Sequence, residues 1–158
     1  MKIKYQIGDL FEFIDSFKYE IIIPHIVNIK NCWGAGFVIP LARKWPQAKS
    51  IYHSTCGLYN NYDDLLGEVQ CVYVRQPPNS ILVAHMFAQT LGGKRPLFYN
   101  ALYKCMDNVA VRAKKIGAVI IAPMFGSGLA GGNWSFIKEL IEDCWLTQGI
   151  PVTIFKLK

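Results

Sequence analysis

Hydrophobic residues along this chain recur with two different periods. Runs rich in β-branched residues, several of them alternating apolar and polar positions, are typical of β-strands. Between these runs the apolar residues recur every three or four positions, which is typical of amphipathic helices. The pattern predicts strands over 2–6, 20–27, 69–75, 81–86, 118–122 and 152–156.

The helix boundaries can be predicted from prolines and capping residues. Pro96 can open the longest predicted helix, and Asn133 is a good N-cap for the last one. Pro46 ends one predicted helix and allows another to begin, and Pro40 is tolerable because it falls in a first turn. The predicted helices cover 37–45, 47–56, 98–116 and 134–145.

Strands that alternate with helices predict an α/β sandwich with a largely parallel sheet. The 158 residues, 52% of them hydrophobic, are enough for one domain with a sizeable core, so intrinsic disorder is excluded. No repeat or linker divides residues 1–158, and no apolar run approaches the roughly 20 residues that cross a bilayer. The N-terminus does not have the pattern of a signal peptide, so we expect a cytoplasmic protein without membrane contact.

The charge and the cysteines narrow the classes of partner. With 17 basic and 11 acidic residues the net charge is +6, which favours anionic partners or indicates a solvated basic surface. The basic residues are scattered, so a nucleic-acid arm is not expected. Five cysteines without close spacing predict that most of them are reduced core thiols, and neither a structural metal nor a cofactor is expected.

Two glycine-rich segments each lead from a predicted strand into a predicted helix. They span 28–36 and 123–133. Glycine lets a ligand approach the backbone closely, and the unpaired N–H groups of the following helix suit phosphate. Neither segment matches a P-loop or a dinucleotide-binding fingerprint. Two such loops in one domain predict a diphosphate held between them.

Two further loops lie at 57–67 and 89–95. The first can be a plain connector. The second follows the C-terminal end of a buried strand, where ligands bind in folds of this class.

Four short motifs together resemble the macro domain family, and they match in order and spacing over essentially the whole chain. They are Gly8-Asp9-Leu10, His25-x-x-Asn28, Trp33-Gly34-Ala35-Gly36 and Phe125-Gly126-Ser127-Gly128. The chain is most similar to the compact branch that contains the yeast ADP-ribose-1″-phosphate phosphatase, the glutamate-directed ADP-ribosyl hydrolases and phage-encoded macro proteins. The resemblance implies a three-layer α/β/α sandwich with a mixed, mostly parallel six-stranded sheet and an ADP-ribose cleft across the strand ends.

The resemblance also implies roles for individual residues. Asp9, next to Leu10, matches the aspartate that binds the adenine amino group; the less favoured alternative is a turn in which Asp9 only caps a helix. Asn28 matches the asparagine that faces the distal ribose, although a buried asparagine serving the backbone would look identical. Trp33 could shield the distal site or simply pack. The diphosphate and distal ribose are expected at Gly34, Ala35, Gly36, Phe125, Gly126, Ser127, Gly128, Leu129 and Ala130.

Departures from the family pattern bear on the chemistry. The glutamate-directed hydrolases carry an aspartate where this chain has Ala130, and a lysine in the loop that here begins Ala88-Gln89. Without that pair, ADP-ribosyl-protein hydrolysis is disfavoured. The phosphatase branch has a histidine at the position of His25, which could act as proton donor or phosphoryl acceptor, or could be only a core histidine.

The sequence therefore predicts an ADP-ribose-binding domain that hydrolyses ADP-ribose-1″-phosphate, with His25 and Asn28 as the catalytic pair. The alternative is a non-catalytic binder that sequesters ADP-ribose or a related nucleotide. Nucleic-acid binding ranks last because no stripe of aromatic and basic residues is present. We expect a monomer.

Overall fold

The computed structural model describes residues 1–156, which form one six-stranded sheet in the order β1-β6-β5-β2-β4-β3. Neighbouring strands are parallel except for β3, which runs antiparallel to β4 at one edge. The mixed, mostly parallel sheet that the sequence predicts is therefore confirmed. The strands are β1 (Lys4–Ile7), β2 (Ile21–Asn28), β3 (Val69–Arg75), β4 (Ile81–Gln89), β5 (Val119–Pro123) and β6 (Val152–Lys156).

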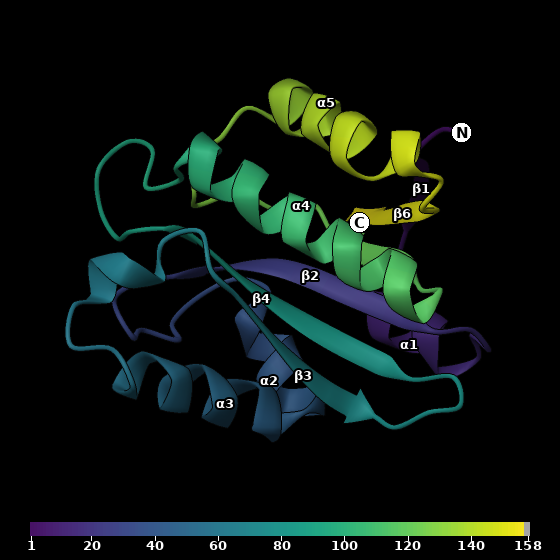
Figure 1. Cartoon of the computed structure of the whole chain (residues 1–158), viewed down its shortest axis with the longest axis horizontal. Helices are drawn as coiled ribbons and strands as arrows, with labels where there is room; N and C mark the ends of the chain where they lie inside the picture. Colours follow the sequence, from purple (N-terminus) through teal and green to yellow (C-terminus); the bar gives the residue numbers. More distant parts are fainter. Residues whose placement is uncertain (157–158) are drawn as a thin grey trace.

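Helices cover both faces of the sheet, so the sandwich has three layers (Figure 1). Two helices lie on one face, α4 (Tyr99–Ile116) and α5 (Trp134–Cys144). The opposite face carries α1 (Leu10–Asp15), α2 (Val38–Lys44) and α3 (Pro46–Gly57). Short 3₁₀ turns occur at Tyr62–Leu65 and Leu146–Gln148. Among the described residues, no helix is both long and apolar enough to cross a membrane.

The two central strands are buried on both faces, which explains why they read as continuous apolar runs. Alternate residues of β2 serve opposite layers: Ile22 packs in the core under α4 and α5, whereas Ile21 and Ile23 pack with α1. His25 has the same parity as Ile23, so it belongs to the layer of α1, α2 and α3. The central strands thus deliver His25 and Asn28 to one end of the sheet.

Most predicted elements exist with ends shifted by one to three residues, one predicted helix start is wrong, and one helix was not predicted. Pro96 does not open α4, which begins three residues later at Tyr99, because the amide of Leu97 bonds Ala130 O in a neighbouring loop. The helix α1 is not predicted as an element, since its six residues are too few to show a period. Pro46 is itself the first residue of α3.

The cysteines are all free, and three of them lie in the core. Burial raises the pKa of Cys105 to about 12 and that of Cys144 to about 11, so both stay protonated at neutral pH. Cys56 is also buried and Cys71 partly so. Cys32 is the exposed one, in the loop after β2, so the prediction that most of the cysteines lie in the core agrees with the structure.

Candidate functional site

A large cleft of about 1690 Å³ opens at the carboxyl ends of the parallel strands. Residues at or just beyond the ends of β1, β2, β4, β5 and β6 line it, which is where ligands bind in sheets of this kind. The structure brings together at this cleft every site residue that the sequence singles out. These are Asp9, Leu10, His25, Asn28, Trp33, Gly34, Ala35, Gly36, Phe125, Gly126, Ser127, Gly128, Leu129 and Ala130.

Asn28 anchors the first glycine-rich loop. Its Oδ1 accepts hydrogen bonds from the amides of Lys30 at 2.9 Å and Cys32 at 3.3 Å, and its Nδ2 donates to Cys32 O at 2.7 Å. The hydroxyl of Tyr52, on α3, lies 2.8 Å from both the backbone O and Oδ1 of Asn28. Asn28 therefore serves the backbone, as one interpretation expects, and one of its two amide hydrogens has no acceptor among residues 1–156.

The second glycine-rich loop packs closely against its neighbours at three glycines where a Cβ would be too close to another atom. Gly126 has a φ of +82°, and a Cβ there would lie 2.8 Å from Ile137. A Cβ on Gly131 would collide with Lys94 O, and one on Gly132 with Gly126 O. The path of this loop is therefore fixed by close backbone packing.

At two other positions in these loops, packing within the protein does not explain why the residue is glycine. Gly34 and Gly128 have ordinary backbone conformations, and a Cβ at either would meet nothing within 4 Å. The fold does not require glycine at these two positions. Both line the cleft, so the free space at Gly34 and Gly128 is space for whatever occupies it.

The same loops present unused hydrogen-bond donors. The amides of residues 34–36 and 127–130 donate to no acceptor within residues 1–156. The first group precedes α2 and the second precedes α5. Free amides next to helix N-termini suit an anionic group held between the loops.

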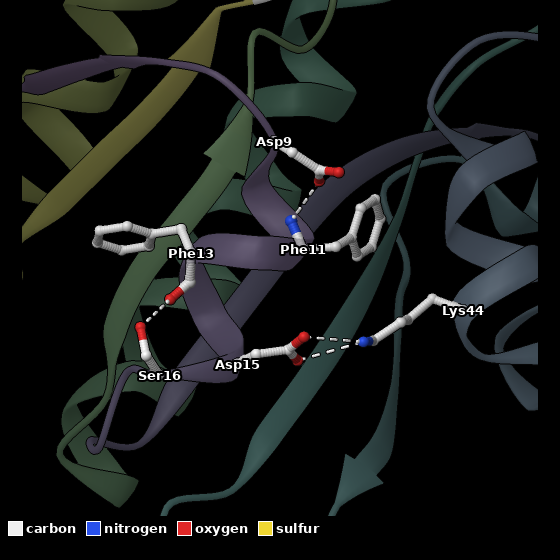
Figure 2. Close-up of polar contacts among 6 residues, drawn as sticks. All are labelled: Asp9, Phe11, Phe13, Asp15, Ser16 and Lys44. Carbon is white, nitrogen blue, oxygen red and sulfur yellow. Dashed lines mark hydrogen bonds and ion pairs between the residues drawn. The ribbon is translucent and has the colours of Figure 1, made fainter.

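Asp9 caps α1 and still has an oxygen to spare (Figure 2). Its Oδ1 accepts a hydrogen bond from the Phe11 amide at 2.8 Å, while the other carboxylate oxygen points away from the helix. The same short helix is tied to α2 by an ion pair, since Lys44 Nζ lies 3.2 Å from both carboxylate oxygens of Asp15. Both interpretations of Asp9 are therefore compatible, because capping occupies only one of its oxygens.

Aromatic side chains that the sequence reading did not single out also line the cleft. Phe11 and Phe37 are stacked with ring centroids 5.6 Å apart, and Phe13 lies 5.2 Å from Phe155. Pro40 and Lys156 also line the cleft and were not predicted, whereas Gln89, Leu91, Gly92 and Gly93 belong to the 89–95 loop that the sequence indicates as a candidate ligand-binding loop. The carboxyl-end rule for parallel strands points to Gln89, Phe155 and Lys156, because they stand at the ends of β4 and β6.

The loop after β4, suspected from the sequence, does contribute to the cleft, whereas the 57–67 loop does not line it. The latter instead supports the first glycine-rich loop, since Asn31 Nδ2 lies 3.4 Å from the hydroxyl of Tyr62. Asn31 adopts a φ of +59°, and its Oδ1 lies 2.6 Å from His53 Nδ1.

His25 is 2% exposed, beneath Trp33 and Phe37. Its Nε2 lies 2.6 Å from Nδ1 of His85, whose Nε2 lies 2.9 Å from Ala48 O. Burial, with His85 adding to it, holds the pKa of His25 well below its usual range, and burial lowers the pKa of His85 to about 4. Both imidazoles are therefore neutral at pH 7.

Trp33 has two roles. Its Nε1 donates a hydrogen bond to Val38 O at 3.0 Å and its ring centroid lies 5.6 Å from that of His85, so Trp33 packs in the protein. It also lines the cleft, so it can shield the site.

The acidic residues that line the cleft are Asp9 and Glu12, both at α1, so neither glycine-rich loop carries a carboxylate.

Comparisons with known proteins point to one family. No family model matches the chain. A macrodomain protein from Streptomyces coelicolor is 33% identical, with a TM-score of 0.78 and coverage of 98% of this chain and 99% of that one. A Bacteroides thetaiotaomicron protein of unknown function is 31% identical, with a TM-score of 0.87 and 98% of both chains covered.

One curated protein is similar over part of the chain. The ADP-ribose 1″-phosphate phosphatase of Saccharomyces cerevisiae (strain YJM789) is 32% identical over 76 residues, which are 48% of this chain and 41% of the yeast protein. The match thus spans less than half the length of that curated relative.

Proposed function

The chain belongs to the macrodomain family, and from this premise we propose that its cleft binds ADP-ribose and hydrolyses the 1″-phosphate of ADP-ribose-1″-phosphate. Partial similarity to the yeast ADP-ribose 1″-phosphate phosphatase supports this choice of substrate. The cleft has the size, the free amides and the strand-end position that a dinucleotide-like ligand needs.

The binding proposal rests mainly on two glycines that the fold itself does not require. Gly34 and Gly128 leave open space on the two loops whose amides are free. A diphosphate between residues 34–36 and 127–130 would use that space and accept from those amides. The unoccupied oxygen of Asp9 would accept from the adenine amino group, and the distal ribose would lie toward Asn28 and Trp33.

The phosphatase step assigns a defined role to His25. Water attacks phosphorus, the bond from phosphorus to the 1″ oxygen breaks, and ADP-ribose and inorganic phosphate leave. Because burial keeps His25 neutral in the free protein, it starts as an acceptor: it takes a proton from the attacking water and passes that proton to the departing 1″ oxygen, so the imidazolium forms only in passing. In the other route His25 itself attacks phosphorus as the 1″ oxygen leaves, and water then cleaves the phosphohistidine to release inorganic phosphate. The free amides of residues 127–130 would stabilise charge on the transferring group.

A second candidate is a binder without catalysis, favoured by two observations. His25 is buried, and neither glycine-rich loop supplies a carboxylate as an acid or base partner. The same absence in the loops, together with the buried methyl group at Ala130, disfavours hydrolysis of ADP-ribosylated protein.

Two assays on the wild-type protein test the proposal in sequence. Calorimetry with ADP-ribose should show micromolar binding, and phosphate release from ADP-ribose-1″-phosphate should then show turnover. A simple phosphomonoester such as para-nitrophenyl phosphate serves as the control for a contaminating phosphatase. Tight binding with no phosphate release would move the protein to the binder class, and no binding at millimolar ADP-ribose would reject both.

A further inference from the structure

A chain of two hydrogen bonds runs from α3 through β4 to β2, behind the cleft. Ala48 O lies 2.9 Å from Nε2 of His85, and Nδ1 of His85 lies 2.6 Å from Nε2 of His25. A carbonyl oxygen can only accept, so His85 Nε2 carries a hydrogen and donates it. A neutral imidazole has one N–H, so His85 Nδ1 is a bare acceptor and His25 Nε2 must carry the hydrogen between them.

The same reasoning gives the protonation state of His25 Nδ1, the last atom in this series of hydrogen bonds. His25 Nε2 carries the single hydrogen of a neutral ring, so its Nδ1 carries a lone pair. Within residues 1–156, that Nδ1 is buried and has no hydrogen-bond partner. A buried acceptor without a donor is unfavourable, and so it is unusual in a folded protein. The other end of the chain, at Ala48, is fully satisfied.

We propose that His85 is a positioning residue: it holds His25, which lines the cleft, in the tautomer whose bare Nδ1 can accept a hydrogen bond from an O–H group that occupies the cleft beside it. The O–H group is a ligand hydroxyl or the attacking water. This inference rests on the proposed function only for what fills the cleft, since the tautomer follows from the contacts of the free protein.

The geometry around α3 supports a positioning role rather than simple packing. Ala48 and Tyr52 are one turn apart on α3, so they lie on the same face of the helix. Ala48 fixes His85 and thereby His25, while the Tyr52 hydroxyl reaches Asn28. One helix face therefore sets the orientation of both residues proposed for the distal end.

Nitrogen-15 NMR of the histidine rings tests the tautomer in the free wild-type protein. At pH 7 we expect His25 to show a protonated Nε2 and an unprotonated Nδ1, with His85 in the same form. A protonated His25 Nδ1, a charged ring, or rapid averaging of the two tautomers would overturn the proposal. This result does not depend on whether ADP-ribose binds.

Two substitutions at His85 separate positioning from packing. His85→Phe keeps a ring but removes the acceptor, so the two His25 nitrogens should average and phosphate release should fall at least tenfold. His85→Asn returns an amide oxygen as acceptor and should restore both the tautomer and most of the turnover. His53→Phe removes a histidine that does not touch His25 and should leave the His25 resonances unchanged.

The two proposals fail in distinguishable ways. If His85→Phe leaves the His25 tautomer as in the wild type, His85 does not position it and this inference is wrong, whatever the enzyme assay shows. If the wild-type tautomer is as expected but no phosphate is released, the phosphatase proposal fails and the role of His85 in fixing the tautomer stands.

Discussion

Replacing Gly128 with glutamate should abolish ADP-ribose binding and leave the fold intact. Gly128 has an ordinary backbone conformation, and a side chain there would meet no protein atom within 4 Å of its Cβ. A surface substitution of this kind changes the free energy of unfolding by about 0.5 kcal/mol or less. Any large effect of this substitution on ADP-ribose binding must therefore come from its position in the cleft, not from unfolding.

The expected effect on binding can be worked from charge. Two unit charges about 4 Å apart near a protein surface repel by roughly 4 kcal/mol at an effective dielectric constant of about 20. Even after screening by salt halves this value, about 2 kcal/mol remains, and the glutamate also fills the space that the diphosphate needs. We expect the charge alone to weaken binding by roughly 30-fold, since about 1.4 kcal/mol is a factor of ten, and the lost space to weaken it further.

Calorimetry with ADP-ribose measures the effect, and melting temperatures check the fold. Gly57→Glu is the matched control, because Gly57 also has an ordinary conformation and open space but does not line the cleft. Gly126→Ala makes the opposite comparison: it should lower the melting temperature, because its φ is +82° and its Cβ would lie 2.8 Å from Ile137. If Gly128→Glu binds ADP-ribose within threefold of the wild type, the diphosphate does not lie between these loops.

Three further predictions follow from single side chains. Asp9→Ser can keep the cap on α1 but loses the free carboxylate oxygen, so calorimetry should show ADP-ribose binding at least tenfold more weakly. The wild-type protein should bind the hypoxanthine analogue more weakly than ADP-ribose, and equal affinity for the two would remove Asp9 from adenine recognition. His25→Phe keeps a ring under Trp33 and should cut phosphate release by roughly 10²- to 10⁴-fold while ADP-ribose still binds, and wild-type turnover in this variant would exclude catalysis by His25. Burial lowers the pKa of His85 to about 4 in the folded protein, so the unfolded chain takes up a proton first as the pH falls below about 6.5. Urea unfolding should therefore show a stability that is full above that pH and is lower at pH 5, by roughly 2 kcal/mol from His85 alone, and the lowered pKa of His25 adds to this loss. His85→Leu should make the dependence shallower, and an unchanged dependence would contradict the lowered pKa of His85.

The sheet could be predicted from the sequence because its strands are read from short-range pattern alone. The predicted ranges for β3 and β6 agree with the structure at both ends, and the rest differ by one to three residues. The parallel direction followed from the alternation of strands and helices. The six-residue helix α1 could not be predicted, because a helix shorter than two turns shows no period.

The site residues could be placed at one cleft because motif order fixes which strand ends carry them. Sequence reasoning could not separate the glycines, however. Gly126 and Gly128 look alike in the chain, yet one is required by packing against Ile137 and the other faces open space. That distinction depends on contacts between residues far apart in the chain, which no local pattern encodes.

The partner of His25 was also out of reach of the sequence. His85 lies sixty positions further along, and the sequence gives no sign that it would face His25 rather than the opposite layer. Its place becomes clear from the register of β2 and β4, which pairs His25 with His85 directly. The burial that makes both rings neutral likewise follows from α2 and α3 covering this face.

A crystal structure of the wild-type protein with ADP-ribose tests the central claim most directly. The account predicts the diphosphate between residues 34–36 and 127–130, with its oxygens accepting from the free amides of both loops. It predicts the adenine amino group at the second oxygen of Asp9 and the distal ribose beside Asn28. A ligand bound outside this cleft, or bound in it with the diphosphate away from both glycine-rich loops, would contradict the account.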